Sequence, residues 1–188
     1  MTRIISGFAG SLRLKVPPTG TRPTTDRVRE AIFSALDAQD AIRGARVLDL
    51  YAGTGSLGLE AASRGAASVT LVDKVNAATR IGRENAALVR RAAPRGAEPE
   101  ITVTSSPVQA FLGGAGRRWD LVFIDPPYEL GGAELRHNLD ALVPCLAEGA
   151  VIVLERAARD ALPELPDGLE IERRRDYGET AIFWLRGD

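Results

Sequence analysis

Short apolar runs alternate with longer stretches of helical periodicity from about residue 44 onward. The apolar runs have the length of buried strands and fall at residues 46–50, 68–72, 101–103, 119–124 and 150–154. The stretches between them have helical patterns and fall at residues 57–63, 76–90, a short segment through 111, and 134–146. Strands that alternate with helices are typical of parallel βαβ units. The pattern predicts an α/β fold with a Rossmann-like sheet and helices on both of its faces.

The N-terminal part of the chain departs from this alternation. Apolar residues around Ile4 and Leu12 are separated by glycines, which indicates a small β-hairpin. Thr24-Thr25-Asp26 then has the residue types of a helix N-cap, and apolar residues follow it at helical spacing. We therefore expect residues 1–43 to form an N-terminal hairpin and helix, ahead of an α/β domain at residues 44–188.

The C-terminal end predicts a second hairpin. Residues 169–175 and 180–185 are of strand type and are separated by Tyr177-Gly178. Such a hairpin adds an antiparallel edge to a sheet that is otherwise parallel.

Composition narrows the functional classes. The 188 residues fit one domain of ordinary size, and 45% of them are hydrophobic. A net charge of −1 excludes a uniformly basic nucleic-acid binder, so affinity for a polyanion must come from local patches. The single Cys145 cannot form an internal disulfide, and the single His137 has too few companions for a metal site. Without a membrane-length apolar run or a signal peptide, we expect a cytoplasmic protein with no metal and no membrane contact.

The strand at residues 119–124 ends in Asp125-Pro126-Pro127-Tyr128. Proline fixes φ and has no N–H, so this turn is stiff and presents a carboxylate, carbonyl groups and a ring. Such a surface suits a planar group that donates hydrogen bonds, such as the exocyclic amine of a nucleobase. A plain strand stop, with a packing tyrosine, is the alternative.

A second loop follows the first strand of the α/β part. In Asp49-Leu50-Tyr51-Ala52-Gly53-Thr54-Gly55, the two glycines allow a tight turn and the close approach of a ligand to the next helix. The loop approximates a dinucleotide fingerprint, although Gly58 fits its third position only with a shift of one residue. A simple strand–helix turn is the alternative.

Two acidic residues decide between the ligands that this loop suits. Asp73 closes the second strand, where an acidic side chain accepts hydrogen bonds from ribose hydroxyls; otherwise it is a helix cap. Asp49 precedes the glycines, where a carboxylate repels a pyrophosphate but suits an ammonium group. S-adenosylmethionine carries an ammonium, a sulfonium and no phosphate, and Asp49 therefore favours this methyl donor over a dinucleotide.

The glycine loop, Asp73 and the Asp-Pro-Pro-Tyr turn together resemble the successive motifs of class I S-adenosylmethionine-dependent amino-methyltransferases. The resemblance narrows to the RsmD family of 16S rRNA guanine-N2 methyltransferases on Arg3-Ile4-Ile5-Ser6-Gly7, residues 22–30 and Gly58-Leu59-Glu60-Ala61. It extends from Arg3 to about Leu185. The family implies a seven-stranded sheet with a reversed C-terminal hairpin, a small N-terminal hairpin, and methylation of one guanine in the rRNA of the small ribosomal subunit.

The resemblance also implies roles for individual residues. The donor pocket is expected to comprise Thr24, Asp49, Tyr51, Gly53, Thr54, Gly55, Asp73, Ser106, Val108 and Asp125. Residues 24–29 are expected to cover the methionine end and the target base. The family commonly has Asp or Asn after the third strand, to accept from the adenine amine, whereas this chain has Pro107. Ser106 or a main-chain carbonyl must then replace that acceptor, beside the Val108 N–H.

Catalysis is expected to depend on Asp125, Pro126, Pro127 and Tyr128. The Asp125 carboxylate and the Pro126 carbonyl accept the two hydrogens of guanine N2, which localises its lone pair, and Tyr128 stacks on the base. The predicted RNA-binding residues crowd the N-terminal part: Arg3, Arg13, Lys15, Arg22, Arg27 and Arg29. Arg173-Arg174-Arg175 is a second basic cluster, although alternation along a strand would split it between two faces.

Three other readings stay open. An adenine-N6 methyltransferase of DNA or RNA shares the Asp-Pro-Pro-Tyr motif, although the chain is short for a separate target-recognition domain. A non-catalytic RNA-binding module of ribosome assembly is the second, and the intact Asp49, Asp73 and Asp125 argue against it. A nicotinamide dehydrogenase is the third, and Asp49 disfavours it. We expect a monomer that acts on the assembling or assembled small ribosomal subunit.

Overall fold

The computed structural model describes residues 2–17, 25–114, 116 and 118–188. Its main sheet has seven strands in the order β5-β4-β3-β6-β7-β9-β8. The strands are β3 (Arg46–Leu50), β4 (Ser68–Asp73), β5 (Glu100–Ser105), β6 (Trp119–Ile124), β7 (Leu146–Ala157), β8 (Leu169–Tyr177) and β9 (Thr180–Gly187). The first five strands pair in parallel, whereas β9 is antiparallel to β7 and β8 to β9. The predicted α/β sheet with a reversed C-terminal hairpin is confirmed.

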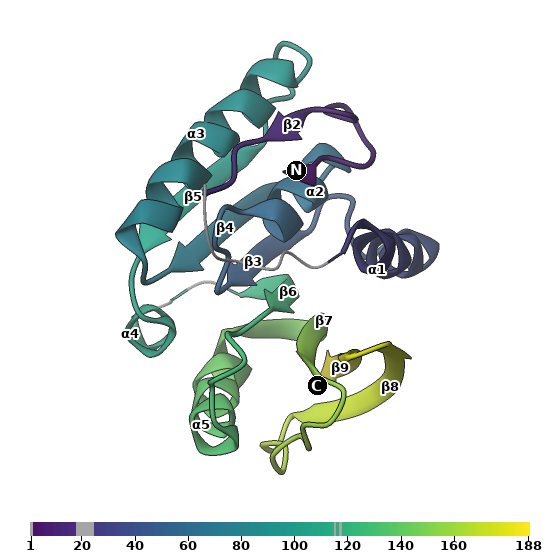
Figure 1. The fold of residues 1–188 in the computed structure, drawn as a ribbon, viewed down its shortest axis with the longest axis vertical. Coiled ribbons are helices and arrows are strands. Elements are labelled where there is room, and N and C mark those ends of the chain that lie inside the picture. Colours follow the sequence, from purple (N-terminus) through teal and green to yellow (C-terminus); the bar gives the residue numbers. More distant parts are fainter. Residues whose placement is uncertain (1, 18–24, 115, 117) are drawn as a thin grey trace.

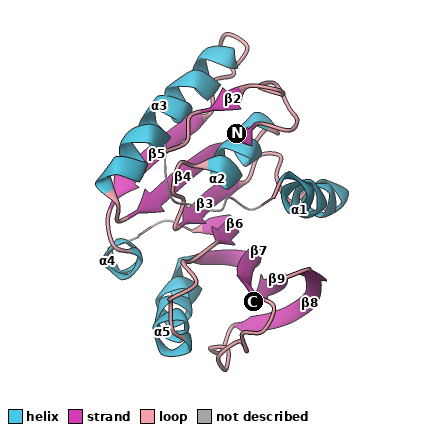
Figure 2. Ribbon diagram, viewed as in Figure 1, coloured by secondary structure: helices cyan, strands magenta, loops and turns pink. Residues whose placement is uncertain are grey.

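Helices cover both faces of this sheet (Figure 1; Figure 2). Helices α1 (Asp26–Ala38), α2 (Ser56–Ser63) and α3 (Asn76–Ala92) share one apolar cluster with inward residues of the strands, such as Val47 and Phe123. Helices α4 (Val108–Gly113) and α5 (Gly132–Leu142) share the other cluster, with strand residues such as Leu48 and Ile124. Because neighbouring strand residues point to opposite faces, the continuous burial of β3 and β6 follows from having helices on both sides.

The N-terminal hairpin is fastened to α2. Its strands are β1 (Thr2–Arg3) and β2 (Arg13–Leu14), which pair antiparallel. The Glu60 carboxylate accepts hydrogen bonds from the backbone N–H groups of Ile5 (2.6 Å) and Ser6 (3.0 Å). At Gly7, φ is +85° and a Cβ would stand 1.9 Å from the Ser63 carbonyl oxygen, so only glycine allows this close approach. Since Ile4 and Leu14 also belong to the core of the sheet, the division at residue 43 stays a prediction.

Two predicted elements differ from the structure at their ends. The helix expected at residues 134–146 ends at Leu142, and a 3-10 turn, η1 (Val143–Cys145), follows because Pro144 has no N–H to continue an α-helix. Strand β7 is longer than the predicted 150–154, since its partner β9 pairs with it as far as Ala157 opposite Thr180.

The basic cluster of β8 is divided between the two faces of the sheet, as strand alternation predicts. The Arg173 guanidinium lies 4.6 Å from the centre of the Trp184 ring, and that of Arg174 lies 5.1 Å from the centre of the Phe183 ring. Trp184 and Phe183 belong to opposite apolar clusters. These two arginines therefore do not form one continuous cationic patch.

Within the described residues, no helix is long and apolar enough to cross a bilayer. The same part of the chain contains no group of three or more His, Cys, Asp or Glu side chains arranged to hold a metal ion.

Candidate active site

Three carboxylates predicted from the sequence lie at one edge of the sheet. Asp49 is in β3, Asp73 ends β4 and Asp125 directly follows β6, and β3 is the strand between the other two. Burial, first of all, and then the charges of Asp125 and Asp73 raise the pKa of Asp49 to about 8. The three groups therefore share one electrostatic environment, as expected for carboxylates at the carboxyl ends of neighbouring parallel strands.

The glycine loop is braced by two of these carboxylates. Asp73 Oδ2 accepts a hydrogen bond from the Gly53 N–H at 2.8 Å, and Asp49 Oδ2 accepts one from the Gly58 N–H at 2.8 Å. Asp73 Oδ1 also accepts from the Val75 N–H at 2.8 Å in the turn before α3, whose N-cap residue is Val75 and which has no side-chain cap. The first bond fixes the β3–α2 turn to β4, and the second fixes the first turn of α2 to β3.

Two glycines of the loop differ in what surrounds them. Gly55 has a φ of +86°, and a Cβ there would lie 2.6 Å from Leu71 Cδ1, so packing on the sheet excludes a side chain. Gly53 has a φ of +55°, but a Cβ there would meet nothing within 4 Å. Open space therefore lies beside Gly53, where a ligand can approach the backbone.

Tyr51 turns the chain at the start of this loop. Its φ of +60° is uncommon for a residue with a side chain and is frequent at functional sites. Its hydroxyl accepts a hydrogen bond from Asn138 Nδ2 of α5 at 2.6 Å, and burial raises its pKa to about 12. The Tyr51 ring is thus held on the α5 side of the sheet, while its main chain forms the start of the glycine loop.

The turn after β6 presents one aromatic ring to solvent. Pro126 is buried, whereas the Tyr128 side chain is 57% exposed. The Leu130 N–H donates to the Pro127 carbonyl at 2.9 Å, and buried Arg156 of β7 donates to the Leu130 carbonyl at 3.0 Å. These bonds fix the turn from both sides.

The residues after β5 lie beside Asp73. The Ser106 N–H donates to the Asp73 carbonyl at 3.0 Å, and Ser106 Oγ donates to the Pro107 carbonyl at 3.1 Å. Pro107 is the N-cap of α4, and Val108 is its first residue and buried. The replacement acceptor for an adenine amine stays a prediction.

The cationic residues of the N-terminal part do not all reach the surface. Arg3, Arg13, Lys15 and Arg27 are exposed, and Lys15 Nζ pairs with Glu84 at 2.7 Å. Arg29 is only 1% exposed and pairs with the buried Glu60 at 3.3 Å, so its expected contact with RNA is wrong. The Arg29 guanidinium also donates to the Arg3 carbonyl at 2.8 Å. Thr24 and Arg22 lie outside the described residues.

Three side chains to which the sequence pattern gave no role organise the site. Glu60 holds the N-terminal hairpin, Asn85 of α3 donates to the Thr54 carbonyl of the glycine loop at 3.0 Å, and Arg156 holds the turn after β6. Glu60 had a visible signal, since it is the one charged residue in the helix Ser56–Ser63. Arg156 gave none, because it follows the predicted end of β7.

A hollow of about 700 Å³ lies at the opposite edge of the sheet. Two of its three acidic residues, Asp120 and Glu172, are ion-paired with Arg46 and Arg186. We therefore place the candidate active site at the carboxylate edge, where the charges of Asp125 and Asp73 act on the buried Asp49.

Two relatives of this chain are described as rRNA methyltransferases, and one solved structure is described as a putative methyltransferase. Residues 2–186 match the model of a family described as conserved hypothetical protein 95. Over 180 residues the chain is 37% identical to the ribosomal RNA small subunit methyltransferase D of Escherichia coli K12, covering 95% of this chain and 86% of that protein. It is 34% identical to a putative rRNA methyltransferase of Bacillus subtilis, with 98% and 100% covered.

A solved structure described as a putative methyltransferase from Escherichia coli superposes with a TM-score of 0.85 at 33% identity, covering 100% of this chain and 98% of that one. A hypothetical protein from Thermus thermophilus superposes with a TM-score of 0.81 at 35% identity, with 98% of both chains covered.

Proposed function

The chain belongs to the conserved hypothetical protein 95 family, the RsmD family that its motifs resemble, and from that premise we propose that it methylates the exocyclic N2 amine of one guanine in 16S rRNA. The relatives support an rRNA methyltransferase. The finer assignment, guanine N2 with S-adenosylmethionine as donor, is our proposal. The observation that carries it is the convergence of Asp49, Asp73 and Asp125 on one edge, with Asp125 opening a proline-stiffened turn.

The donor side of the site fits S-adenosylmethionine. A cationic ligand suits this edge, because burial and the two neighbouring carboxylates disfavour the charge of Asp49 in the absence of a counter-charge. The open space at Gly53 lets a ligand approach the loop, and the half-buried Asp73 stands beside it as a ribose partner. Asp49, with one oxygen held by Gly58, is the partner for the ammonium group.

S-adenosylmethionine, when bound, supplies an electrophilic methyl group. The chain's own contribution is to orient and activate the amine. The Asp125 carboxylate and the Pro126 carbonyl accept its two hydrogens, and Asp125 stabilises the positive charge that develops on nitrogen. Tyr128 offers an exposed ring for stacking, a contact that is worth roughly 1–3 kcal/mol per base. The target base must first leave its stack, which costs least in an RNA loop.

RNA contact is assigned to the exposed cations of the hairpin and α1, namely Arg3, Arg13, Lys15 and Arg27. They lie on elements that are fastened to α2 and to the glycine loop, so RNA held there is held close to the donor pocket. The small ribosomal subunit is the proposed partner, and residues 1–43 are the proposed RNA-binding and pocket-covering part.

The test is the Asp125→Ala variant, assayed with labelled S-adenosylmethionine and small subunits from a strain that lacks this gene. We expect methyl transfer to be lost while donor affinity, measured by calorimetry, stays within a factor of about three, since one contact of many is removed. Nucleoside analysis of the wild-type product should give N2-methylguanine. Retained turnover in the variant would overturn the mechanism. N6-methyladenine would identify an adenine enzyme, and the absence of any labelled nucleoside would favour a non-catalytic assembly module.

A further inference from the structure

A hollow of about 450 Å³ lies beside the catalytic turn, lined by Tyr128, Ala157, Ala158, Arg159, Gly178 and Glu179. These residues belong to the turn after β6, the end of β7 and the β8–β9 turn. In the strand order, β7 and β9 lie on one side of β6, and β3, which leads into the glycine loop, lies on the other. The hollow is therefore on the side of the turn after β6 that faces away from the glycine loop.

The walls of this hollow are fixed by hydrogen bonds. The Ala158 N–H donates to the Glu179 carbonyl at 2.8 Å, and the Arg174 guanidinium donates to the Ala158 carbonyl at 2.9 Å. Next to the lining residue Ala157, Arg156 donates to the Leu130 carbonyl at 3.0 Å and to the Asp160 carboxylate at 3.0 Å. Both main-chain groups of Ala158 are thus engaged, so the hollow is preformed.

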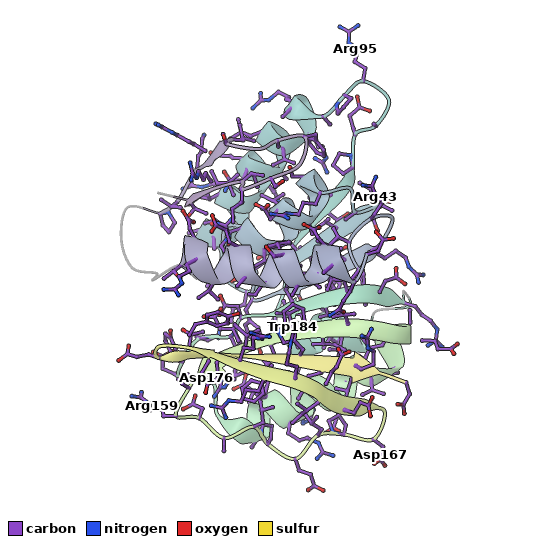
Figure 3. All side chains as sticks on the ribbon, turned by 90° about the vertical axis from the view of Figure 1, so that its right-hand side faces the viewer. Arg43, Arg95, Arg159, Asp167, Asp176 and Trp184 are labelled. Carbon is purple, nitrogen blue, oxygen red and sulfur yellow. The ribbon has the colours of Figure 1, made fainter. Side chains whose placement is uncertain are left out.

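The lining has the chemistry of a nucleotide site. Tyr128 supplies an exposed ring, and Arg159 an exposed guanidinium that lies near the tip of the β8–β9 hairpin (Figure 3). Ala157, Ala158 and Gly178 are small, and a Cβ at Gly178 would meet nothing within 4 Å. Aromatic stacking together with an arginine for phosphate is how proteins hold single-stranded nucleic acid, and the volume is in the usual range of roughly 300–1,000 Å³ for small-molecule sites.

Asp125 is not part of the lining, which decides which nucleotide fits. The target amine must reach the Asp125 carboxylate, so the base in the hollow cannot be the methylated one. Resting on the proposed function, we propose that the hollow holds a nucleotide that flanks the target in the RNA strand, with its base on the face of the Tyr128 ring opposite the target base and its phosphate at Arg159. The hollow then contributes to the choice of the methylated position.

The test uses Arg159→Ala and Ala158→Leu, with Arg95→Ala as the matched control. Arg95 is also exposed, but it lies at the far end of the molecule (Figure 3). We expect Arg159→Ala to lower kcat/KM for subunits about tenfold and to reduce the salt slope of RNA binding by about one. Ala158→Leu should fill the hollow. This variant should therefore methylate an RNA fragment with an abasic site beside the target as efficiently as it methylates the intact fragment. Arg95→Ala should change neither quantity, and donor affinity should stay constant in all three.

The outcomes separate the two proposals. Unchanged kcat/KM and an unchanged salt slope in Arg159→Ala, with turnover still lost in Asp125→Ala, would overturn the flanking-nucleotide site and leave the proposed function standing. Lost donor affinity in Arg159→Ala would assign the hollow to the donor and also overturn the site. If the wild-type protein methylates no RNA, the proposed function fails. The RNA affinities of the wild type and Arg159→Ala then test the site: weaker binding by the variant supports it, and equal binding overturns it. If Ala158→Leu does not fold, the surface variant Arg159→Ala carries the test alone.

Discussion

The side-chain amide of Asn85 binds both main-chain polar groups of Lys15. Oδ1 accepts from the Lys15 N–H at 2.8 Å, and Nδ2 donates to the Lys15 carbonyl at 3.0 Å. Nδ2 also donates to the Thr54 carbonyl at 3.0 Å. One fully buried side chain on α3 therefore connects the segment that follows the N-terminal hairpin to the glycine loop.

Replacing Asn85 by Ala should lower both the free energy of unfolding and the affinity for the methyl donor. The change leaves three buried or half-buried backbone groups without their partner, so we expect a loss of about 2 kcal/mol in unfolding free energy. Because Thr54 loses its restraint, donor affinity should fall as well. Urea unfolding and calorimetry with S-adenosylmethionine measure the two effects. Full donor affinity in a destabilised variant would show that Asn85 supports the fold without positioning the loop.

The burial of Asn85 and Arg29 shows what the sequence pattern did and did not reveal. Arg29 precedes Ile32, Phe33 and Leu36 by three, four and seven residues, so helical geometry alone places it on the apolar face of α1. Its membership of a run of arginines favoured a surface role instead. Asn85 likewise shares a helix face with the buried Val89, four residues later. In both cases helical periodicity indicated that the side chain is buried. The partner that makes burial of a polar side chain possible is supplied only by the tertiary structure.

The carboxylate edge, in contrast, could be predicted residue by residue. Asp73 and Asp125 end apolar runs of strand length, and the carboxyl ends of parallel strands meet at one edge. The hollow beside Tyr128 could not be predicted, because it depends on β7 continuing to Ala157 beyond its apolar run. That extension comes from pairing with β9, and its charged Arg156 is buried by a contact with the Leu130 carbonyl.

Replacing Gly58 by Ala should destabilise the protein, although alanine normally favours a helix by roughly 1 kcal/mol over glycine. A Cβ at this position would lie 2.4 Å from Leu71 Cδ2 and 2.9 Å from Val69 Cγ1, and 3.1 Å from the Asp49 carboxylate. We expect α2 to be displaced from the sheet at a cost of about 1–3 kcal/mol. The matched control is Gly132→Ala in α5, where a Cβ would meet nothing within 4 Å. Equal or greater stability of Gly58→Ala in urea unfolding would contradict this packing.

The buried carboxylate of Asp49 should make stability depend on pH. Its pKa is raised to about 8 in the folded chain, against about 3.9 in an unfolded one, so the folded state binds more protons between these values. Stability should therefore fall as the pH rises from about 4 toward 8. Asp49→Asn stays neutral and keeps an acceptor for the Gly58 N–H, so its advantage in Tm over wild type should grow from pH 5 to pH 9. A constant difference would disprove the raised pKa. Donor affinity should rise with pH, because an ammonium group favours the ionised carboxylate.

Arg27 and Arg29 lie two residues apart on α1. Replacing Arg29 by Met should lower stability, whereas replacing Arg27 by Met should lower RNA affinity. Arg29 is buried and donates to Glu60 and to the Arg3 carbonyl, while Glu60 keeps its ion pair with Arg64 at 2.7 Å. Loss of these charged hydrogen bonds should destabilise the protein by about 1.5–3 kcal/mol. Arg27 is exposed, so stability should change by less than about 0.5 kcal/mol. RNA affinity should instead weaken in Arg27→Met, with the salt slope of binding reduced by about one. Urea unfolding and RNA binding at several salt concentrations separate the two, and unchanged RNA affinity in Arg27→Met would remove α1 from the proposed RNA surface.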